Sequence, residues 1–195
     1  HEPHVHAFYE ILWFQQGEGI HTVDFTDYEV KPGTIFFLTP GQIHHFDDKE
    51  RYRGVSIKMC TDFMRDEKDP GSLSLKYDIF HAFDAPPYYI IDADTAVTLG
   101  RIVEAMEHEE HENQAFGNID MLKALLHMFL INVLRYGSQA QGQQAYELRP
   151  ARMLFLQFRQ AVERHYREKH SVQDYADLLN VAARTLNKCV NDCSG

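Results

Sequence analysis

Hydrophobic and polar residues alternate through the first part of the chain, from His4 to about Ile91. Positions 4, 6, 8, 10, 12 and 14 share one side of an extended segment, because successive side chains on a strand point to opposite faces. After a turn at Gly17, residues 21–25 are expected to continue as one strand, and further turns fall at residues 31–33 and 40–41. Many short strands separated by such turns predict a β-sandwich or barrel over residues 1–91.

The hydrophobic period changes to that of a helix after Asp92. Residues 95–112 place apolar side chains on one stripe and acidic side chains on the other side. A second helix is expected from Asn118 to Leu134, and it is apolar almost all round. A second copy of the chain is the cover we expect for such a helix, so the pattern predicts a homodimer through residues 94–136. On this hypothesis Leu126→Asp disrupts the dimer.

Residues 138–149 are rich in Gly, Ser and Gln without periodicity, which predicts a linker. Pro150 begins another helix, and Ser171 is the expected cap of two short helices that surround a turn at residues 180–181. The chain therefore divides into a barrel at 1–91, a helical region at 92–137, the linker at 138–149 and a helical unit at 150–195. The fold class is α+β.

The composition is 44% hydrophobic and 25% charged, as in ordinary globular proteins. No apolar run reaches the roughly 18 residues of a membrane span, so we expect no membrane partner. Three cysteines without metal-ligand spacing suggest a reducing, cytoplasmic location. A net charge of −10 argues against nucleic-acid binding by the whole chain, but residues 150–195 carry 7 Lys/Arg against 5 Asp/Glu. Binding to phosphates depends on a local basic face, so this region permits it.

Two histidine motifs carry candidate chemistry: His4-x-His6-x-x-x-Glu10, and a second that runs from Pro40-Gly to His44. Both resemble the two motifs of the cupin superfamily, which implies a double-stranded β-barrel with a divalent metal held by His4, His6, Glu10 and His44. Imidazole and carboxylate ligands suit such ions. Alternatively, these side chains bond one another or a small organic ligand. His45, beside His44, leaves open which ring points inward.

The last 25 residues fit a helix-turn-helix, in which Ala176 allows close helix approach and Leu186 is buried. Its second helix leaves four polar side chains free for a DNA major groove. These are Arg184, Thr185, Asn187 and Lys188. An ordinary helical hairpin is the alternative interpretation.

The order of barrel, two helices, linker and helix-turn-helix resembles the AraC-type family of bacterial transcription regulators. The resemblance is carried by residues 6–13, 40–44 and 172–195, and it implies an effector-binding barrel, dimerising helices and DNA binding. That family has a second helix-turn-helix, and this chain opens at His1 rather than Met, so we expect a piece of a longer protein. We also expect DNA binding to need the complete C-terminal domain.

We therefore predict a regulator, not an enzyme, that needs no cofactor and binds a small metabolite such as a sugar. An aromatic wall with imidazoles and a carboxylate suits a sugar ring and its hydroxyls. The candidate effector residues are His4, His6, Phe8, Glu10, Phe14 and His44. The rival hypothesis is a metal-dependent cupin enzyme, such as a dioxygenase or isomerase.

Overall fold

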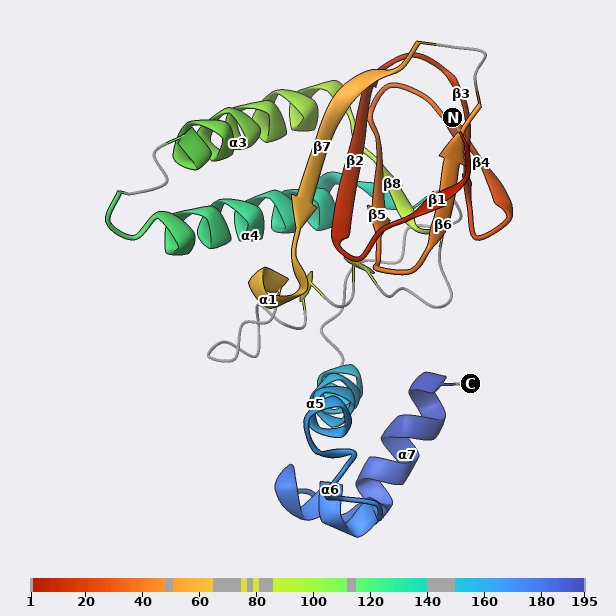
Figure 1. Ribbon diagram of the computed structural model, residues 1–195, viewed down its shortest axis with the longest axis vertical. Helices are drawn as coiled ribbons and strands as arrows, with labels where there is room; N and C mark the ends of the chain where they lie inside the picture. The colour runs from red at the N-terminus through yellow and green to blue at the C-terminus, as the bar shows by residue number, and fades with distance from the viewer. Residues whose placement is uncertain are drawn as a thin grey trace. The chain divides into compact units, whose positions relative to one another are not determined.

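A computed structural model describes residues 2–47, 51–64, 75–76, 79–80, 86–111, 115–139 and 150–194. The chain forms two compact units, His1–Ala145 and Tyr146–Gly195. The first is a barrel-like pair of sheets with helices on one side, and the second is all-helical (Figure 1). The fold is thus α+β, as the sequence predicts.

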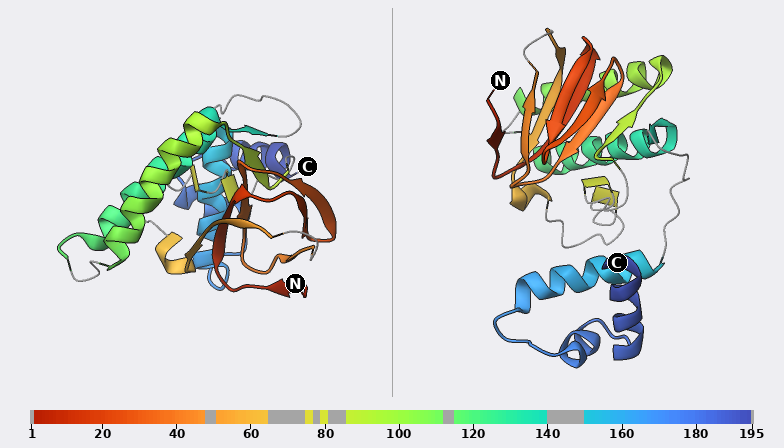
Figure 2. Two further views of the ribbon diagram at one scale, coloured as in Figure 1. Left: turned by 90° about the horizontal axis from the view of Figure 1, so that it is seen from above. Right: turned by 90° about the vertical axis from the view of Figure 1, so that its right-hand side faces the viewer.

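Two antiparallel sheets face each other in the first unit (Figure 2). The four-stranded sheet has the order β1 (His4–Val5), β6 (Ile43–Phe46), β3 (Gly19–Val23), β4 (Thr26–Val30). The five-stranded sheet has the order β7 (Arg53–Met59), β2 (Tyr9–Gln16), β5 (Thr34–Leu38), β8 (Tyr88–Ile90), β9 (Ser138–Gln139). A short helix, α1 (Thr61–Met64), follows β7.

Successive side chains along β2 point alternately into two different apolar cores. Phe14 packs in the core enclosed by the sheets, with Phe36 and Leu38 of β5. Ile11 and Trp13 face the other way, into a larger core that includes helical residues. Because the side-chain period of a strand is two, this one segment can line the barrel interior and also seat the helices.

Helices α3 (Ala93–His111) and α4 (Asn118–Tyr136) pack together on the outer face of the five-stranded sheet (Figure 1). Leu126 and Phe129 of α4 are at most 2% exposed within this core, so Leu126→Asp would disrupt the fold and is the wrong probe of a dimer. Met121 and Met128 are each 51% exposed on the same helix. The apolar side chains of α4 that stay outside this core, such as Met121 and Met128, therefore lie on its outer side.

Three expectations from the sequence are corrected. The extended segment that begins at His4 is broken, since β1 and β2 belong to different sheets. Residues 21–25 are not one strand, because Asp24 and Phe25 have φ values of 47° and 65° and turn the chain into β4. The predicted 138–149 linker begins inside the sheet, where Ser138 and Gln139 pair with β8, and residues 140–149 lie outside the described part.

The second unit contains α5 (Pro150–His165), α6 (Val172–Leu178) and α7 (Ala183–Ser194). Ser171 caps α6, since its hydroxyl accepts from the Asp174 amide while the Asp174 carboxylate accepts from the Ser171 amide. Ala176 and Leu186, both 0% exposed, form the contact between α6 and α7. Among the helices of the described residues, we find none of the length and apolarity that crossing a membrane requires.

Candidate functional site

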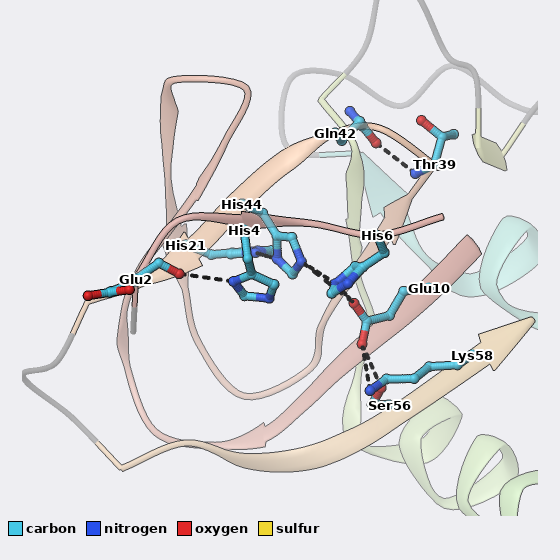
Figure 3. Close-up of polar contacts among 10 residues, drawn as sticks. All are labelled: Glu2, His4, His6, Glu10, His21, Thr39, Gln42, His44, Ser56 and Lys58. Atoms are coloured by element: carbon cyan, nitrogen blue, oxygen red, sulfur yellow. Dashed lines mark hydrogen bonds and ion pairs between the residues drawn. The ribbon is translucent and has the colours of Figure 1, made fainter. Parts of the chain in front are cut away.

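Strand pairing brings the two histidine motifs together. β1 runs antiparallel to β6 with His4 opposite His44, and the chain then crosses to β2, which carries Glu10. His6 lies in the crossing segment and turns toward both His44 and Glu10 (Figure 3). The four side chains predicted from the sequence therefore meet at one end of the barrel. We call His4, His6, Glu10 and His44 the histidine cluster.

Three atoms of the histidine cluster form a tight triangle. His6 Nε2 lies 2.7 Å from His44 Nε2 and 3.0 Å from Glu10 Oε2, and His44 Nε2 lies 3.7 Å from Glu10 Oε2. The fourth member, His4, has a ring nitrogen within 4.8 Å of ring nitrogens of His6 and His44.

The triangle matches the size of a divalent ion. Its circumradius is about 1.9 Å, and a point slightly out of its plane lies ~2.0–2.2 Å from all three atoms, as in Zn–N and Zn–O bonds. Glu10 Oε2 is buried with no aligned hydrogen-bond donor among the described residues, which leaves a lone pair for a ligand. The donor set thus fits a divalent metal, and His4, at the exposed rim, offers a fourth donor within 4.8 Å of the other two histidines.

Glu10 is 4% exposed and needs compensation for its charge. The Ser56 hydroxyl donates a 2.7 Å hydrogen bond to Oε1, and the Lys58 ammonium lies 4.0 Å from the same oxygen. Lys58 stands directly opposite Glu10 in the β2–β7 register. These two partners hold one carboxylate oxygen, so that the other faces the imidazoles.

Burial keeps the inner imidazoles neutral. His21 of β3 is 0% exposed, and its Nε2 shares a 3.0 Å hydrogen bond with His44 Nδ1. Desolvation is the largest cause that lowers the pKa of His21 to about 3, and the charge of His44 is the second. The pKa of His44 is lowered to about 4, mainly by desolvation and to a smaller extent by the charges of His4 and His6. Both rings are therefore uncharged at neutral pH, the form that binds metals or accepts hydrogen bonds.

A pocket of about 160 Å³ opens next to the histidine cluster. It is mostly apolar, and its lining residues come from β2, the end of β6, β7 and the segment between β6 and β7. They are Leu12, Trp13, Phe14, Phe46, Tyr52, Arg53, Gly54, Val55 and Ser56. Ser56 belongs to this pocket and also bonds Glu10, so the pocket and the histidine cluster share a wall.

The remaining effector candidates fall in two places. Phe8 stacks on His6 at a centroid distance of 4.4 Å, at the histidine cluster. Phe14 lines the pocket instead, and its ring centroid lies 6.0 Å from that of His21. The structure also decides between the neighbouring rings on β6, because His44 is buried and enters the histidine cluster while His45 is only half-buried.

Three residues of this site were not found by sequence reasoning: His21, Ser56 and Lys58. His21 and Val23 share the inward phase of β3, which is a local signal for an interior imidazole. The contacts of Ser56 and Lys58 depend on which residues of β7 stand opposite β2, and no local pattern contains that register.

The proposed DNA-reading residues share one environment. Arg184, Thr185, Asn187 and Lys188 are all exposed on α7, while Leu186 between them is buried. The helix thus presents a polar face opposite its packed side. Ala182 directly precedes α7 and its carbonyl accepts the first helical hydrogen bonds.

Comparison with known proteins places these features in context. Residues 1–130 match the sequence model of the family described as the AraC-like ligand binding domain. The chain is 22% identical over 203 residues to the HTH-type transcriptional activator RhaS of Enterobacter sp. (strain 638), covering 98% of this chain and 66% of that protein. It is 24% identical over 145 residues to the HTH-type transcriptional activator RhaR of Escherichia coli (strain K12), covering 70% and 48%.

Two solved structures are also similar. The AraC-like transcriptional activator CuxR gives a TM-score of 0.44 at 10% identity, over 97% of this chain and 63% of that one. ToxT from Vibrio cholerae O395 gives 0.42 at 14% identity, over 100% and 71%. This chain spans about half to two thirds of the length of the curated relatives named here. Since the family match extends over more than half of the sequence, the chain belongs to the family of the AraC-like ligand binding domain.

Proposed function

We propose that this chain is the effector-binding, dimerising and partly DNA-reading portion of a ligand-responsive transcription regulator. The observation that carries the proposal is the presence, in one chain, of an AraC-like ligand binding domain and a helix pair with an exposed polar face on α7. The relatives named as HTH-type transcriptional activators support it. Effector occupancy changes promoter affinity only if the effector binds the two states of the regulator differently.

DNA binding is tested with the full-length protein and DNA fragments from upstream of its gene, by fluorescence anisotropy at two salt concentrations. We expect Lys188→Ala to weaken binding to all fragments and to reduce the salt slope by about 1. Asn187→Ala should instead reduce the preference between sequences. Arg167→Ala removes an exposed charge outside α7 and is the matched control for Arg184→Ala. Equal losses of DNA affinity in Arg184→Ala and Arg167→Ala would mean that binding reflects only general electrostatic attraction, which would contradict the proposal.

The effector is proposed to bind at the histidine cluster and the adjoining pocket. A volume of about 160 Å³ is below the roughly 300–1,000 Å³ typical of pockets for drug-sized ligands, so a compact metabolite is the best match. The imidazoles and the carboxylate of the histidine cluster suit its hydroxyl groups. Thermal-shift screening should therefore include small sugars and hydroxy acids. A ligand at 100 times its Kd stabilises by about 2.7 kcal/mol. The shift should vanish in Glu10→Gln, and an undiminished shift would place the ligand elsewhere.

Dimerisation through residues 94–136 is proposed from the exposed apolar side chains of α4. We expect Met128→Asp to shift the sedimentation profile toward monomer, because a charge would enter an apolar contact. Phe25→Asp is the control, since Phe25 is 85% exposed on the β3–β4 turn, outside the proposed interface. A profile unchanged by Met128→Asp would exclude this face.

A divalent cation at the histidine cluster is a second candidate, favoured by the triangle of His6, His44 and Glu10 atoms. Purification without added ions, followed by metal analysis of wild type and His6→Ala, tests it. Stoichiometric metal in wild type that is lost in His6→Ala is the expected result. Substrate turnover that also depends on this metal would favour the rival enzyme hypothesis over a regulator.

A further inference from the structure

A fourth imidazole lies behind the histidine cluster. His21 sits on β3, beside β6, with Val23 opposite His44 and His21 opposite Phe46. Its ring is stacked on Phe46 at 4.5 Å between centroids and meets Phe36 edge-to-face at 4.4 Å. No atom of His21 is exposed, and its one hydrogen bond given by the structure joins Nε2 to His44 Nδ1 at 3.0 Å. His21 is therefore placed to determine, from inside the barrel, which ring nitrogen of His44 carries a hydrogen.

The charge of Glu10 decides which ring nitrogen of His44 carries the hydrogen. The carboxylate Oε2 lies 3.0 Å from His6 Nε2 without an aligned hydrogen bond, and its negative charge favours a hydrogen, which carries partial positive charge, over a lone pair on that nitrogen. His6 Nε2 is also 2.7 Å from His44 Nε2, so a hydrogen on His6 leaves a lone pair on His44 Nε2. A neutral imidazole carries one N–H, and that of His44 must then be on Nδ1.

The inner contact favours the opposite arrangement. If His44 donates from Nδ1, His21 accepts at Nε2 and carries its own hydrogen on Nδ1, which has no partner among the described residues. An unpaired N–H costs more than an unpaired lone pair. The outer contact involves the charge of the Glu10 carboxylate, whereas the inner contact joins two neutral rings, so the outer preference prevails.

We propose that His21 is a positioning residue of the histidine cluster, which accepts the Nδ1 hydrogen of His44 and so keeps a lone pair on His44 Nε2. That lone pair meets the His6 N–H in the free chain and a ligand in the bound chain. This inference rests on the proposal that the histidine cluster is a ligand site. The site then suits a ligand that approaches His44 with a divalent cation or with a hydrogen-bond donor, such as a hydroxyl group. Metal-binding histidines usually donate their second ring N–H to a fixed acceptor, and His21 supplies that acceptor.

The first test is the tautomer of His44 in the ligand-free chain, read from long-range ¹H–¹⁵N spectra of the imidazole rings at pH 7. We expect the hydrogen of His44 on Nδ1 and that of His6 on Nε2. A hydrogen on Nε2 of His44 would overturn the proposal. This measurement needs no variant and no bound ligand, so it decides the role of His21 even if the proposal of a ligand site fails.

The second test is a Zn²⁺ titration by calorimetry of the chain and two variants. His21→Phe fills the space without an acceptor, and we expect it to weaken Zn²⁺ binding roughly 10–100-fold. His21→Gln offers an amide oxygen near the position of Nε2 and should stay within about 3-fold of wild type, with the same His44 tautomer. The matched control is His45→Gln on β6, next to His44, which should bind like wild type.

The outcomes separate the two proposals. Equal Zn²⁺ affinity in wild type and a folded His21→Phe would overturn the role of His21 while leaving the metal site intact. Absence of Zn²⁺ binding in wild type would remove the metal candidate, and the tautomer spectra would still decide the role of His21. If His21→Phe does not fold, the comparison of wild type with His21→Gln remains, and a loss in His21→Gln as large as in His6→Ala would overturn the proposal.

Discussion

Lowering the pH from 7 to 5 should destabilise the first unit through its two inner imidazoles. The pKa of His21 is lowered to about 3 and that of His44 to about 4, against 6.5 in the unfolded chain. A group whose folded pKa is lowered contributes stability above its unfolded pKa and loses it as the pH falls toward the folded value. The affected window therefore begins near pH 6.5 and extends to about pH 3–4.

The size of the effect follows from proton linkage. At pH 5 each unfolded imidazole binds nearly one proton, whereas each folded ring remains neutral, which costs about 2 kcal/mol per ring. The two rings together lower the free energy of unfolding by about 4 kcal/mol, a large share of the ~5–15 kcal/mol typical of a domain. The carboxyl of Asp92, whose pKa is lowered by its hydrogen bonds with Thr95, acts only at lower pH and does not confuse this window.

The assay is urea unfolding followed by fluorescence of Trp13 in buffers that contain a chelator. Trp13 is the single tryptophan and is 3% exposed in the core of the first unit, so its signal reports this unit alone. Wild type should lose about 4 kcal/mol between pH 7 and pH 5, and His21→Gln about half of that, because one buried ring remains. Equal stability at both pH values, or an equal loss in His21→Gln, would refute the reasoning.

Three further outcomes are expected from single substitutions, the first two followed by Trp13 fluorescence. Phe25→Gly should raise the free energy of unfolding by about 0.5–1 kcal/mol, because Phe25 is exposed at φ 65° and glycine adopts this conformation without strain; a decrease would contradict this. Leu126→Ala should cost about 2–5 kcal/mol by leaving a cavity, against at most about 0.5 kcal/mol for Met128→Ala in the monomer, and similar losses would show that α4 packs differently. Ser171→Ala should cost the second unit about 1 kcal/mol and speed hydrogen exchange at the Asp174 amide, whereas unchanged exchange would rule out the cap.

Local patterns in the sequence were enough for the elements and for much of the candidate site. The period of two along β2 predicts that Glu10 and Phe14 face inward, and the change of period after Asp92 predicts two helices. Ser171 predicts the start of α6 because a capping side chain acts within three residues. The grouping of His4, His6 and Glu10 is also local, since all three lie within seven residues.

Only the tertiary structure decided what lies behind and beside the histidine cluster. The contact of His21 with His44 requires β3 to pair with β6, and the contact of Ser56 with Glu10 requires β7 to pair with β2. Strand register is set by the closure of both sheets around a shared core, so no local pattern contains it. The same holds for α4, which is apolar almost all round. Packing on the sheet, not periodicity, decided that Leu126 is buried while residues on the far side stay exposed.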